Sequence, residues 1–245
     1  MKDNPVLKTI AGVWENYTDE EYRRDQSHWR GYGRWKDDEK WQRIGQTSLE
    51  KLNTLMTHIG AQPGIWTKPR TFLEWGPGGG ANLFAHMRYA HRYYGVDISQ
   101  KNLSECSRLA KAEHFDGFRE ALLDGDPMSI VDKIDEPVDT FLSSAVFQHF
   151  PSKDYGAEVL QAIHAVTAPR AIGHIQIRYD DGKEKYRPIE SLEDYEERHI
   201  TATSFPIHEF HDLCEDVGFK VLYMSSIVTR TNYLTFNLIK KTASK

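Results

Sequence analysis

The sequence lacks the features of a disulfide-bonded, zinc-binding or membrane-spanning protein. It has only two cysteines, Cys106 and Cys214, which lie far apart and form no Cys-x-x-Cys pair. This excludes a disulfide framework and a cysteine-based zinc site, and it indicates a reducing compartment. No stretch approaches the roughly 20 apolar residues that span a bilayer, and residues 1–10 lack the apolar core of a signal peptide. We therefore expect a cytoplasmic protein that does not act at a membrane.

A surplus of positive charge is also missing. The chain has 31 Lys and Arg against 36 Asp and Glu, which gives a formal net charge of -5. Proteins that neutralise phosphates usually carry a basic surplus, so we expect no nucleic-acid partner. The length of 245 residues and the hydrophobic share of 39% suffice for a sizeable core. The oligomeric state stays unknown at this level.

Aromatic and charged side chains crowd the first part of the chain, from residue 13 to residue 41. Residues 37–59 then follow a helical pattern, with the larger apolar side chains roughly on one side. We expect an N-terminal helical cap or lid over residues 1–65.

Beyond residue 66, short apolar runs alternate with amphipathic segments. We expect strands at residues 71–75, 91–96, 118–123, 138–143 and 171–179, and helices at residues 81–88, 99–114 and 155–166. This alternation predicts an α/β fold with a parallel sheet and helices on both faces. Residues 180–205 are polar and charged, and a segment of this length is more often a lid than a passive connector. The second predicted domain therefore spans residues 66–245 and carries a lid-like insertion at 180–205.

The end of the chain breaks the alternation. A helix at residues 207–217 precedes two strands, at residues 220–227 and 233–240. The connection between these strands is too short for a crossover, so they pair antiparallel. We predict a seven-stranded, mostly parallel sheet with one antiparallel strand near the C-terminus.

A glycine-rich loop joins the first of these strands to the helix after it. Its glycines, Gly76, Gly78, Gly79 and Gly80, allow a sharp turn and a close approach to a ligand, although an ordinary tight turn also explains them. Asp97 ends the second strand, where an acid can accept hydrogen bonds from both hydroxyls of a ribose. Together these features predict a cofactor that contains adenosine.

Glu74, on the strand just before the glycines, narrows the choice of cofactor. A carboxylate at this place would repel the pyrophosphate of a dinucleotide, which binds at a free helix N-terminus. It suits a ligand with an ammonium group instead. The sequence therefore favours S-adenosylmethionine over a nicotinamide dinucleotide, and it disfavours a nicotinamide-dependent oxidoreductase.

From about Arg70 to Lys241 the sequence resembles the class I S-adenosylmethionine-dependent methyltransferases. Five motifs carry the resemblance, together with the antiparallel end of the sheet: Glu74-Trp75-Gly76-Pro77-Gly78-Gly79-Gly80, the acid Asp97, Leu123-Asp124-Gly125-Asp126, the stretch from Val138-Asp139-Thr140-Phe141 to Val146-Phe147-Gln148-His149, and Ala168-Pro169. The sequence departs from the family after Pro169, where Arg170-Ala171 replaces the usual double glycine.

The resemblance implies a Rossmann-like fold that binds S-adenosyl-L-methionine and releases S-adenosyl-L-homocysteine. Carried over residue by residue, the cofactor-binding positions are Glu74, Gly76, Pro77, Gly78, Gly80, Asp97, Ile98, Asp126, Ser144 and Ala145. Asp124 is the alternative to Asp126 as the acid that addresses the adenine.

His149 is the candidate general base, because it lies in the turn after the fourth strand, where ligands dock in open α/β sheets. The alternative is that this histidine braces the loop. The fourth strand ends in Ser143 and Ser144 rather than in an acid, and Asp180-Asp181 is the only obvious carboxylate pair in the region. We therefore expect no catalytic metal.

Further candidates for contact with the cofactor or the acceptor lie in the cap and the insertion: Tyr17, Trp29, Arg34, His199 and His208. Aromatic faces attract a sulfonium, and arginine binds carboxylates with two hydrogen bonds. Packing of the cap explains the first three equally well. His208 shares a helix face with His211, which a surface position or a metal site would also explain.

The predicted function is methyl transfer to a small molecule, most readily to an oxygen of a sugar or a secondary metabolite. A cap together with a long insertion is typical of an enclosed pocket rather than a flat macromolecular groove. Two alternatives keep the fold: an aminopropyl-type transferase and a catalytically silent module that only binds the cofactor.

Overall fold

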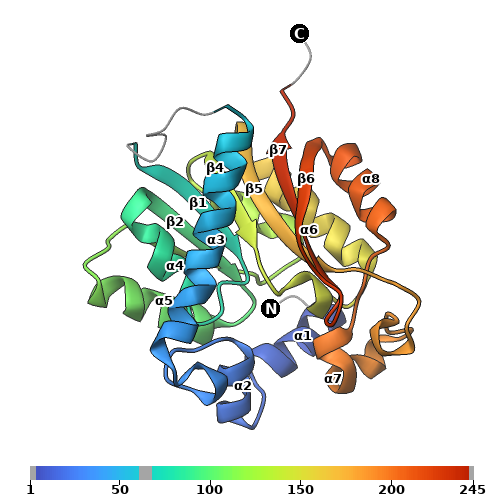
Figure 1. Ribbon diagram of the computed structural model, residues 1–245. Helices are drawn as coiled ribbons and strands as arrows, with labels where there is room; N and C mark the ends of the chain where they lie inside the picture. Colours follow the sequence, from blue (N-terminus) through green and yellow to red (C-terminus); the bar gives the residue numbers. More distant parts are fainter. Residues whose placement is uncertain (1–3, 61–67, 243–245) are drawn as a thin grey trace. The chain divides into compact units, whose positions relative to one another are not determined.

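The computed structural model describes residues 4–60 and 68–242 (Figure 1). Contacts within the chain divide it into two compact units, Ala11–Leu123 and Met1–Ile10 with Asp124–Lys245. The predicted boundary between residues 65 and 66 lies outside the described residues, so the division into a cap and a catalytic domain stays a prediction. Among the described residues, no helix has both the length and the apolar character to cross a membrane.

Helices dominate the first part of the Ala11–Leu123 unit. After α1 (Pro5–Trp14), the chain forms α2 (Glu20–Gln26), the short 3-10 helix η1 (Gly33–Trp35) and the long α3 (Asp38–His58). Asp19 and Asp37 cap α2 and α3, because their carboxylates accept hydrogen bonds from backbone N–H groups in the first turn. The helix expected at residues 37–59 is therefore confirmed, and its start is explained by its cap.

Three parallel strands complete this unit: β1 (Arg70–Trp75), β2 (Ala90–Asp97) and β3 (Phe118–Leu122). Between them lie α4 (Ala81–His86), the 3-10 turn η3 (Met87–Tyr89) and α5 (Gln100–Ala112). Ser99 caps α5 by accepting a hydrogen bond from the backbone N–H of Asn102. Figure 1 shows α3, α4 and α5 in blue to green beside these strands.

The other unit contains the remaining elements. They are η4 (Pro127–Lys133), β4 (Val138–Ser143), η5 (Phe147–His149), α6 (Lys153–Val166), β5 (Thr167–Arg178), η6 (Glu184–Tyr186), η7 (Leu192–Asp194), α7 (Tyr195–Arg198), η8 (His199–Thr201), α8 (Ile207–Val217), β6 (Phe219–Val228) and β7 (Tyr233–Lys240). The insertion at 180–205 is thus built from short helical turns.

The strand order is β3-β2-β1-β4-β5-β7-β6 in a seven-stranded sheet. β4 pairs parallel with β5, whereas β7 pairs antiparallel with both β5 and β6. Residues 229–232 alone connect β6 to β7, which is too short for a crossover. The predicted Rossmann-like sheet with an antiparallel strand near the C-terminus is confirmed.

β5 begins earlier than expected, at Thr167 instead of residue 171. Its pairing with β4 shifts register between Val138 and Thr140, and Arg170 adopts a φ of 64°. That left-handed conformation favours glycine. The register shift and the positive φ explain why residues 167–170 have a turn-like composition although they belong to β5.

Stacked rings fill the core of the Ala11–Leu123 unit. Phe72 stacks on Tyr93 at 5.6 Å and on His86 at 5.5 Å between ring centroids. His86 has no exposed surface, and this burial lowers the pKa of its imidazole to about 4, against an opposing hydrogen bond with the backbone of Asn82. His86 therefore stays neutral where a solvated histidine takes up a proton.

Replacing His86 by phenylalanine tests this buried histidine. The unfolded chain binds a proton at His86 below about pH 6.5, while the folded chain does so only near pH 4, so acid removes stability between these values. When the pH falls from 7 to 5, the free energy of unfolding of the wild type should drop by about 2 kcal/mol more than that of His86→Phe. Urea unfolding followed by circular dichroism measures it, with the exposed His58→Asn as control. Parallel pH dependence in His86→Phe and the wild type would contradict the prediction.

Candidate active site

The glycine loop between β1 and α4 has the backbone that its sequence predicts. Gly76, Gly78 and Gly80 have φ angles of 74°, 52° and 81°, in the left-handed region that favours glycine. The N–H of Gly76 donates to the backbone oxygen of Val96 at 2.8 Å, and that of Gly80 to the oxygen of Pro77 at 2.9 Å. The loop is thereby held against the end of β2.

The N-terminal segment of the same unit approaches this loop closely. The N–H of Gly79 donates to the backbone oxygen of Ser27 at 2.6 Å. A Cβ atom at Gly79 would lie 2.6 Å from both the oxygen of His28 and the Cα of Trp29. The absence of a side chain at Gly79 is therefore required by the protein's own backbone.

Glu74 is enclosed by protein. Its side chain accepts hydrogen bonds from Asn82 Nδ2 at 2.5 Å and from the Tyr93 hydroxyl at 2.6 Å, one on each carboxylate oxygen. Burial raises the pKa of this carboxyl to about 7, and the two hydrogen bonds oppose the shift. In this structure Glu74 connects β1 to α4 and to β2. Its predicted pairing with a ligand ammonium stays a prediction.

Asp97 lies at the carboxyl end of β2 and is 8% exposed. Its Oδ1 accepts from the backbone N–H of Ser99 at 2.8 Å, and its Oδ2 from Asn102 Nδ2 at 3.3 Å. Burial raises the pKa of Asp97 to about 6, while hydrogen bonds from Ser99, Asn102 and Gly78 lower it. A carboxylate beside the glycine loop, followed by the half-buried apolar Ile98, fits a ribose and its base.

Asn102 links Asp97 to the N-terminal segment. Its Oδ1 accepts from Arg23 Nη1 at 3.3 Å and from Trp29 Nε1 at 2.9 Å, and its Nδ2 also donates to Ser27 Oγ at 3.4 Å. Sequence reasoning missed this residue. The only signal was an asparagine in the first turn of a helix that begins beside the expected ribose site.

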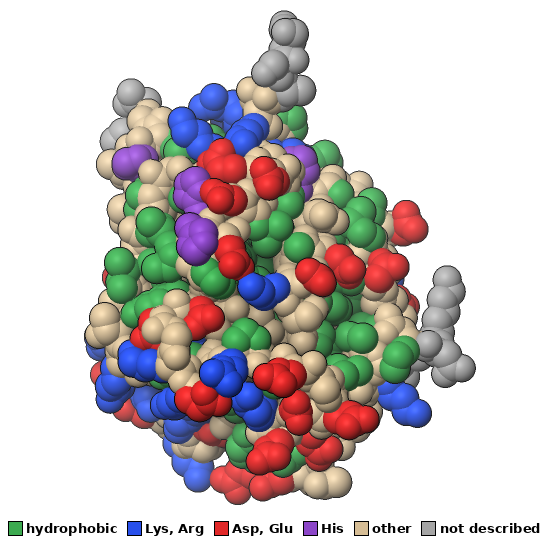
Figure 2. All heavy atoms as spheres, turned by 90° about the vertical axis from the view of Figure 1, so that its right-hand side faces the viewer, with side chains coloured by type: hydrophobic (Ala, Val, Ile, Leu, Met, Phe, Trp, Pro, Cys, Tyr) green, Lys and Arg blue, Asp and Glu red, His purple; other side chains and the backbone are tan. Residues whose placement is uncertain are grey.

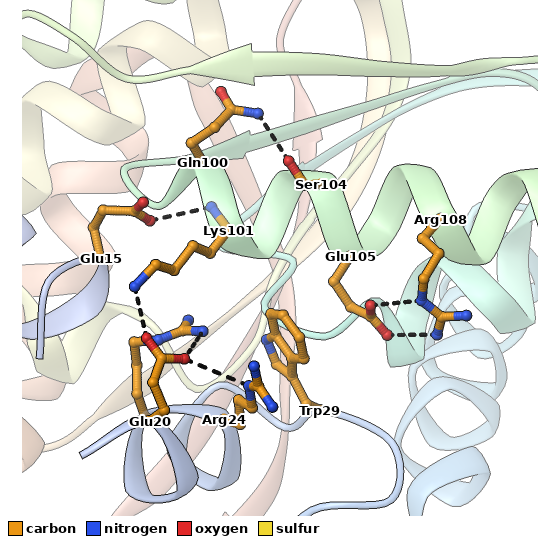
Figure 3. A pocket seen from close by; sticks show the side chains of 10 residues that line it. Glu15, Glu20, Arg24, Trp29, Gln100, Lys101, Ser104, Glu105 and Arg108 are labelled. Atoms are coloured by element: carbon orange, nitrogen blue, oxygen red, sulfur yellow. Dashed lines mark hydrogen bonds and ion pairs between the residues drawn. The ribbon is translucent and has the colours of Figure 1, made fainter. Parts of the chain in front are cut away.

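A pocket of about 510 Å³ adjoins this network (Figure 3). Its walls come from the residue after α1, from α2 and the turn after it, and from α5: Glu15, Glu20, Arg23, Arg24, Trp29, Gln100, Lys101, Ser104, Glu105 and Arg108. Glu15 Oε2 accepts from Ser99 Oγ at 2.6 Å and from the Lys101 N–H at 3.1 Å, so it covers the N-terminus of α5. The pocket walls therefore consist largely of paired charges.

Each of the three candidates in the cap contacts other residues of the same N-terminal segment. The Trp29 ring has the guanidinium groups of Arg23 and Arg24 at 5.1 Å each. Tyr17 packs on the ring of Tyr22 at 5.3 Å between centroids. Arg34 forms an ion pair with Asp25 at 2.8 Å. These contacts support the packing interpretation that the sequence left open beside ligand binding.

In the other unit, the segment after β4 contains the remaining predicted cofactor residues. Ser144 and Ala145 are half-buried, and the N–H of Ala145 donates to Gln176 Oε1 at 2.9 Å. Asp126 accepts from the backbone N–H of Ser129 at 3.1 Å and so caps η4. The exposed alternative, Asp124, pairs with Lys133 at 2.7 Å.

His149 is held by both ring nitrogens. Its Nδ1 lies 2.7 Å from the backbone oxygen of His199, which can only accept, so Nδ1 carries the proton. Its Nε2 then accepts from Gln148 Nε2 at 3.0 Å. The hydroxyl of Tyr195 donates to the backbone oxygen of His149 at 2.7 Å. Tyr195 and His199 of the insertion thus hold the turn in place, and Nε2 of His149 carries no proton.

The other two candidate histidines, His199 and His208, lie in the insertion and in α8. His199 Nδ1 contacts the backbone oxygen of Glu196 at 2.7 Å, so its ring stabilises the insertion. His208 is exposed at the start of α8.

Comparison with known proteins agrees with this geometry. Residues 73–174 match the family Methyltransf_11, described as a methyltransferase domain. Residues 73–174 thus resemble a methyltransferase domain in sequence. The matched segment begins in β1 and ends in β5, and it includes Glu74, Asp97 and His149.

Known proteins resemble the chain at low identity. Cyclopropane mycolic acid synthase 3 of Mycobacterium tuberculosis is 27% identical over 200 residues, which cover 75% of this chain and 64% of that protein. The chain thus matches less than two thirds of that relative's length.

Solved structures show the fold. Magnesium protoporphyrin IX methyltransferase from Synechocystis PCC 6803, with bound S-adenosylmethionine, has a TM-score of 0.63 at 15% identity and covers 97% of this chain and 100% of its own. The 1,6-didemethyltoxoflavin-N1-methyltransferase of Burkholderia thailandensis has a TM-score of 0.51 at 19% identity, over 84% and 80% of the two chains.

Asp97→Asn tests the predicted ribose-binding role of this carboxylate. Only the ionised carboxylate accepts two hydroxyl hydrogen bonds, so protonation near pH 6 should weaken binding of S-adenosylhomocysteine. In the wild type we expect the Kd to rise about tenfold between pH 7.5 and pH 5. Asp97→Asn should bind at least about tenfold more weakly at pH 7.5 and lose the part of the pH dependence that comes from Asp97.

Calorimetric titration at several pH values measures both effects. Asp116→Asn, at an exposed position of the same unit, is the matched control. Wild-type affinity in Asp97→Asn would mean that the ribose binds elsewhere.

Proposed function

We propose that the protein transfers a methyl group from S-adenosylmethionine to an oxygen of a small molecule, with sugars and secondary metabolites as the first acceptors to test. The observation that carries the proposal is the buried Asp97 carboxylate beside the glycine loop of a methyltransferase domain. This is the arrangement that an adenosine-containing cofactor needs.

The insertion covers the turn after β4, which favours a small molecule as the methyl acceptor. Tyr195 and His199 of the insertion are buried and both contact His149 through hydrogen bonds that involve backbone oxygens. A covered turn is typical of an enclosed pocket. Two structurally similar proteins carry the names of small acceptors, magnesium protoporphyrin IX and 1,6-didemethyltoxoflavin.

Acidic, basic and hydrophobic side chains are interspersed on the face shown in Figure 2.

The chemistry divides between the cofactor and the chain. S-adenosylmethionine, when bound, supplies a methyl group that its sulfonium already activates. Asp97 would hold the ribose, and the glycine loop would let the backbone approach the cofactor. His149 Nε2 would take the proton of the acceptor hydroxyl, once the Gln148 amide gives way. The alternative role of His149 is to position the turn.

Transfer is tested with S-adenosylmethionine that carries a labelled methyl group. The protein is incubated with a metabolite extract, and label is followed into small molecules. Label in small molecules supports the proposal. Tight binding of S-adenosylhomocysteine with no labelled product would indicate a silent binding module, and binding of NADH instead would indicate an oxidoreductase.

His149→Ala separates catalysis from bracing. If Nε2 is the base, kcat should fall by about 100-fold or more while the Kd for S-adenosylhomocysteine changes less than about twofold. The rate of label transfer and calorimetry measure these values, with His211→Ala on α8 as control. An unchanged kcat would show that His149 is not the base, and a rise in KM with a lower melting temperature would show bracing.

A further inference from the structure

A buried arginine in the insertion-bearing unit lacks an acidic partner. Arg178 is the last residue of β5 and is 5% exposed. No carboxylate lies within ion-pair distance of it among the residues that the structure describes. Buried charges in proteins are normally paired, because leaving water costs several kcal/mol per ion. Such an arginine therefore indicates either an unusual support or an anion that binds there.

Two tyrosines support the guanidinium. Its Cζ lies 4.8 Å from the ring centroid of Tyr186 and 5.0 Å from that of Tyr233. Cation–π attraction offsets part of the cost of burial. It does not replace hydrogen bonds to the N–H groups at the edge of the guanidinium, because ring faces do not accept hydrogen bonds as an oxyanion does.

Hydrogen-bond donors are in excess around Arg178. Arg178 Nη2 donates to the Tyr233 hydroxyl at 3.0 Å, and Gln148 Nε2 donates to the same oxygen at 3.3 Å. Arg178 Nε is buried and has no partner among the described residues. The Tyr233 oxygen accepts both of these bonds, and within the described part of the chain its own hydrogen is not donated. Across residues 4–60 and 68–242, Arg178 Nε–H is thus a buried donor without an acceptor, and the one buried acceptor of the cluster without a partner, Gln148 Oε1, carries no charge.

The cluster adjoins the candidate base. Gln148, which contacts the Tyr233 hydroxyl, is also the partner of His149 Nε2 at 3.0 Å. Gln176 lies two residues before Arg178, on the same face of β5, and accepts from the N–H of Ala145 after β4. Arg178 is therefore connected to the turn in which the acceptor is expected.

We propose that Arg178 and Tyr233 hold an anionic group of the methyl acceptor, a carboxylate or a phosphate. The inference rests on the proposed function and specifies its substrate class. A guanidinium edge and a phenol hydroxyl together donate to an oxyanion through charge-assisted hydrogen bonds. The anionic group anchors the acceptor and is not the methylated atom, so the methylated product keeps its negative charge.

Anion binding is tested on the protein saturated with S-adenosylhomocysteine. Acetate and inorganic phosphate are titrated at constant ionic strength while the arginine Nε–H signals are followed by nuclear magnetic resonance. The Arg178 signal is the one that disappears in Arg178→Met. It should shift with acetate if the site takes a carboxylate, and with phosphate if it takes a phosphate. Tyr233→Phe should raise the Kd of that probe by about tenfold.

The control is Arg187→Met, which removes an exposed arginine of the neighbouring insertion that pairs with Glu184. It should leave the probe Kd unchanged. A wild-type Arg178 signal that responds to neither anion overturns the proposal. So does an unchanged probe affinity in Tyr233→Phe, because the structure places its hydroxyl on Arg178.

A second readout uses the labelled product of the methyl-transfer assay. Retention on an anion exchanger supports the proposal, and a neutral or cationic product overturns it. The two hypotheses remain distinguishable, because the Arg178 signal is read without turnover. If S-adenosylhomocysteine does not bind the wild type, the proposed function fails, while the response of Arg178 to the anions still decides whether the anion site exists.

Discussion

The burial of the Asp97 carboxylate is the constraint on which the expected cofactor site depends. A carboxylate at 8% exposure is tolerable only when donors surround it. The backbone of Ser99 and the side chain of Asn102 supply them, and Asn102 is in turn held by Arg23 and Trp29. The start of α5, the end of β2 and the N-terminal segment therefore belong to one polar network.

This network changes the interpretation of the cap. Arg23, Arg24 and Trp29 form stacked cation–π pairs, and Trp29 also donates to Asn102. The same segment lies against the glycine loop through Ser27 and Gly79. Its side chains thus shape the surroundings of Asp97 through packing and hydrogen bonds, whatever ligand contacts they make in addition.

In the other unit, the turn after β4 and the insertion are mutually supporting. Tyr195 and the backbone of His199 fix His149, and Tyr186 of the insertion covers one face of Arg178. The hydroxyl of Tyr186 donates to the backbone oxygen of Arg230 between β6 and β7, at 3.0 Å. The insertion is therefore tied to the turn after β4 and to the segment between β6 and β7, by contacts that a lid-like composition alone does not reveal.

The order of strands and helices, the antiparallel end, the glycine loop and the acid at the end of β2 could all be predicted from the sequence. Those features follow from local causes: periodicity, capping residues, turn glycines and a connection too short to cross over. The contacts of Glu74, Asn102 and Arg178 became visible in the folded chain alone. Asn102 meets Arg23 across 79 residues of sequence, and Arg178 meets Tyr233 across 55. Partners so far apart are selected by packing and by the need to satisfy buried polar groups, which no local pattern records.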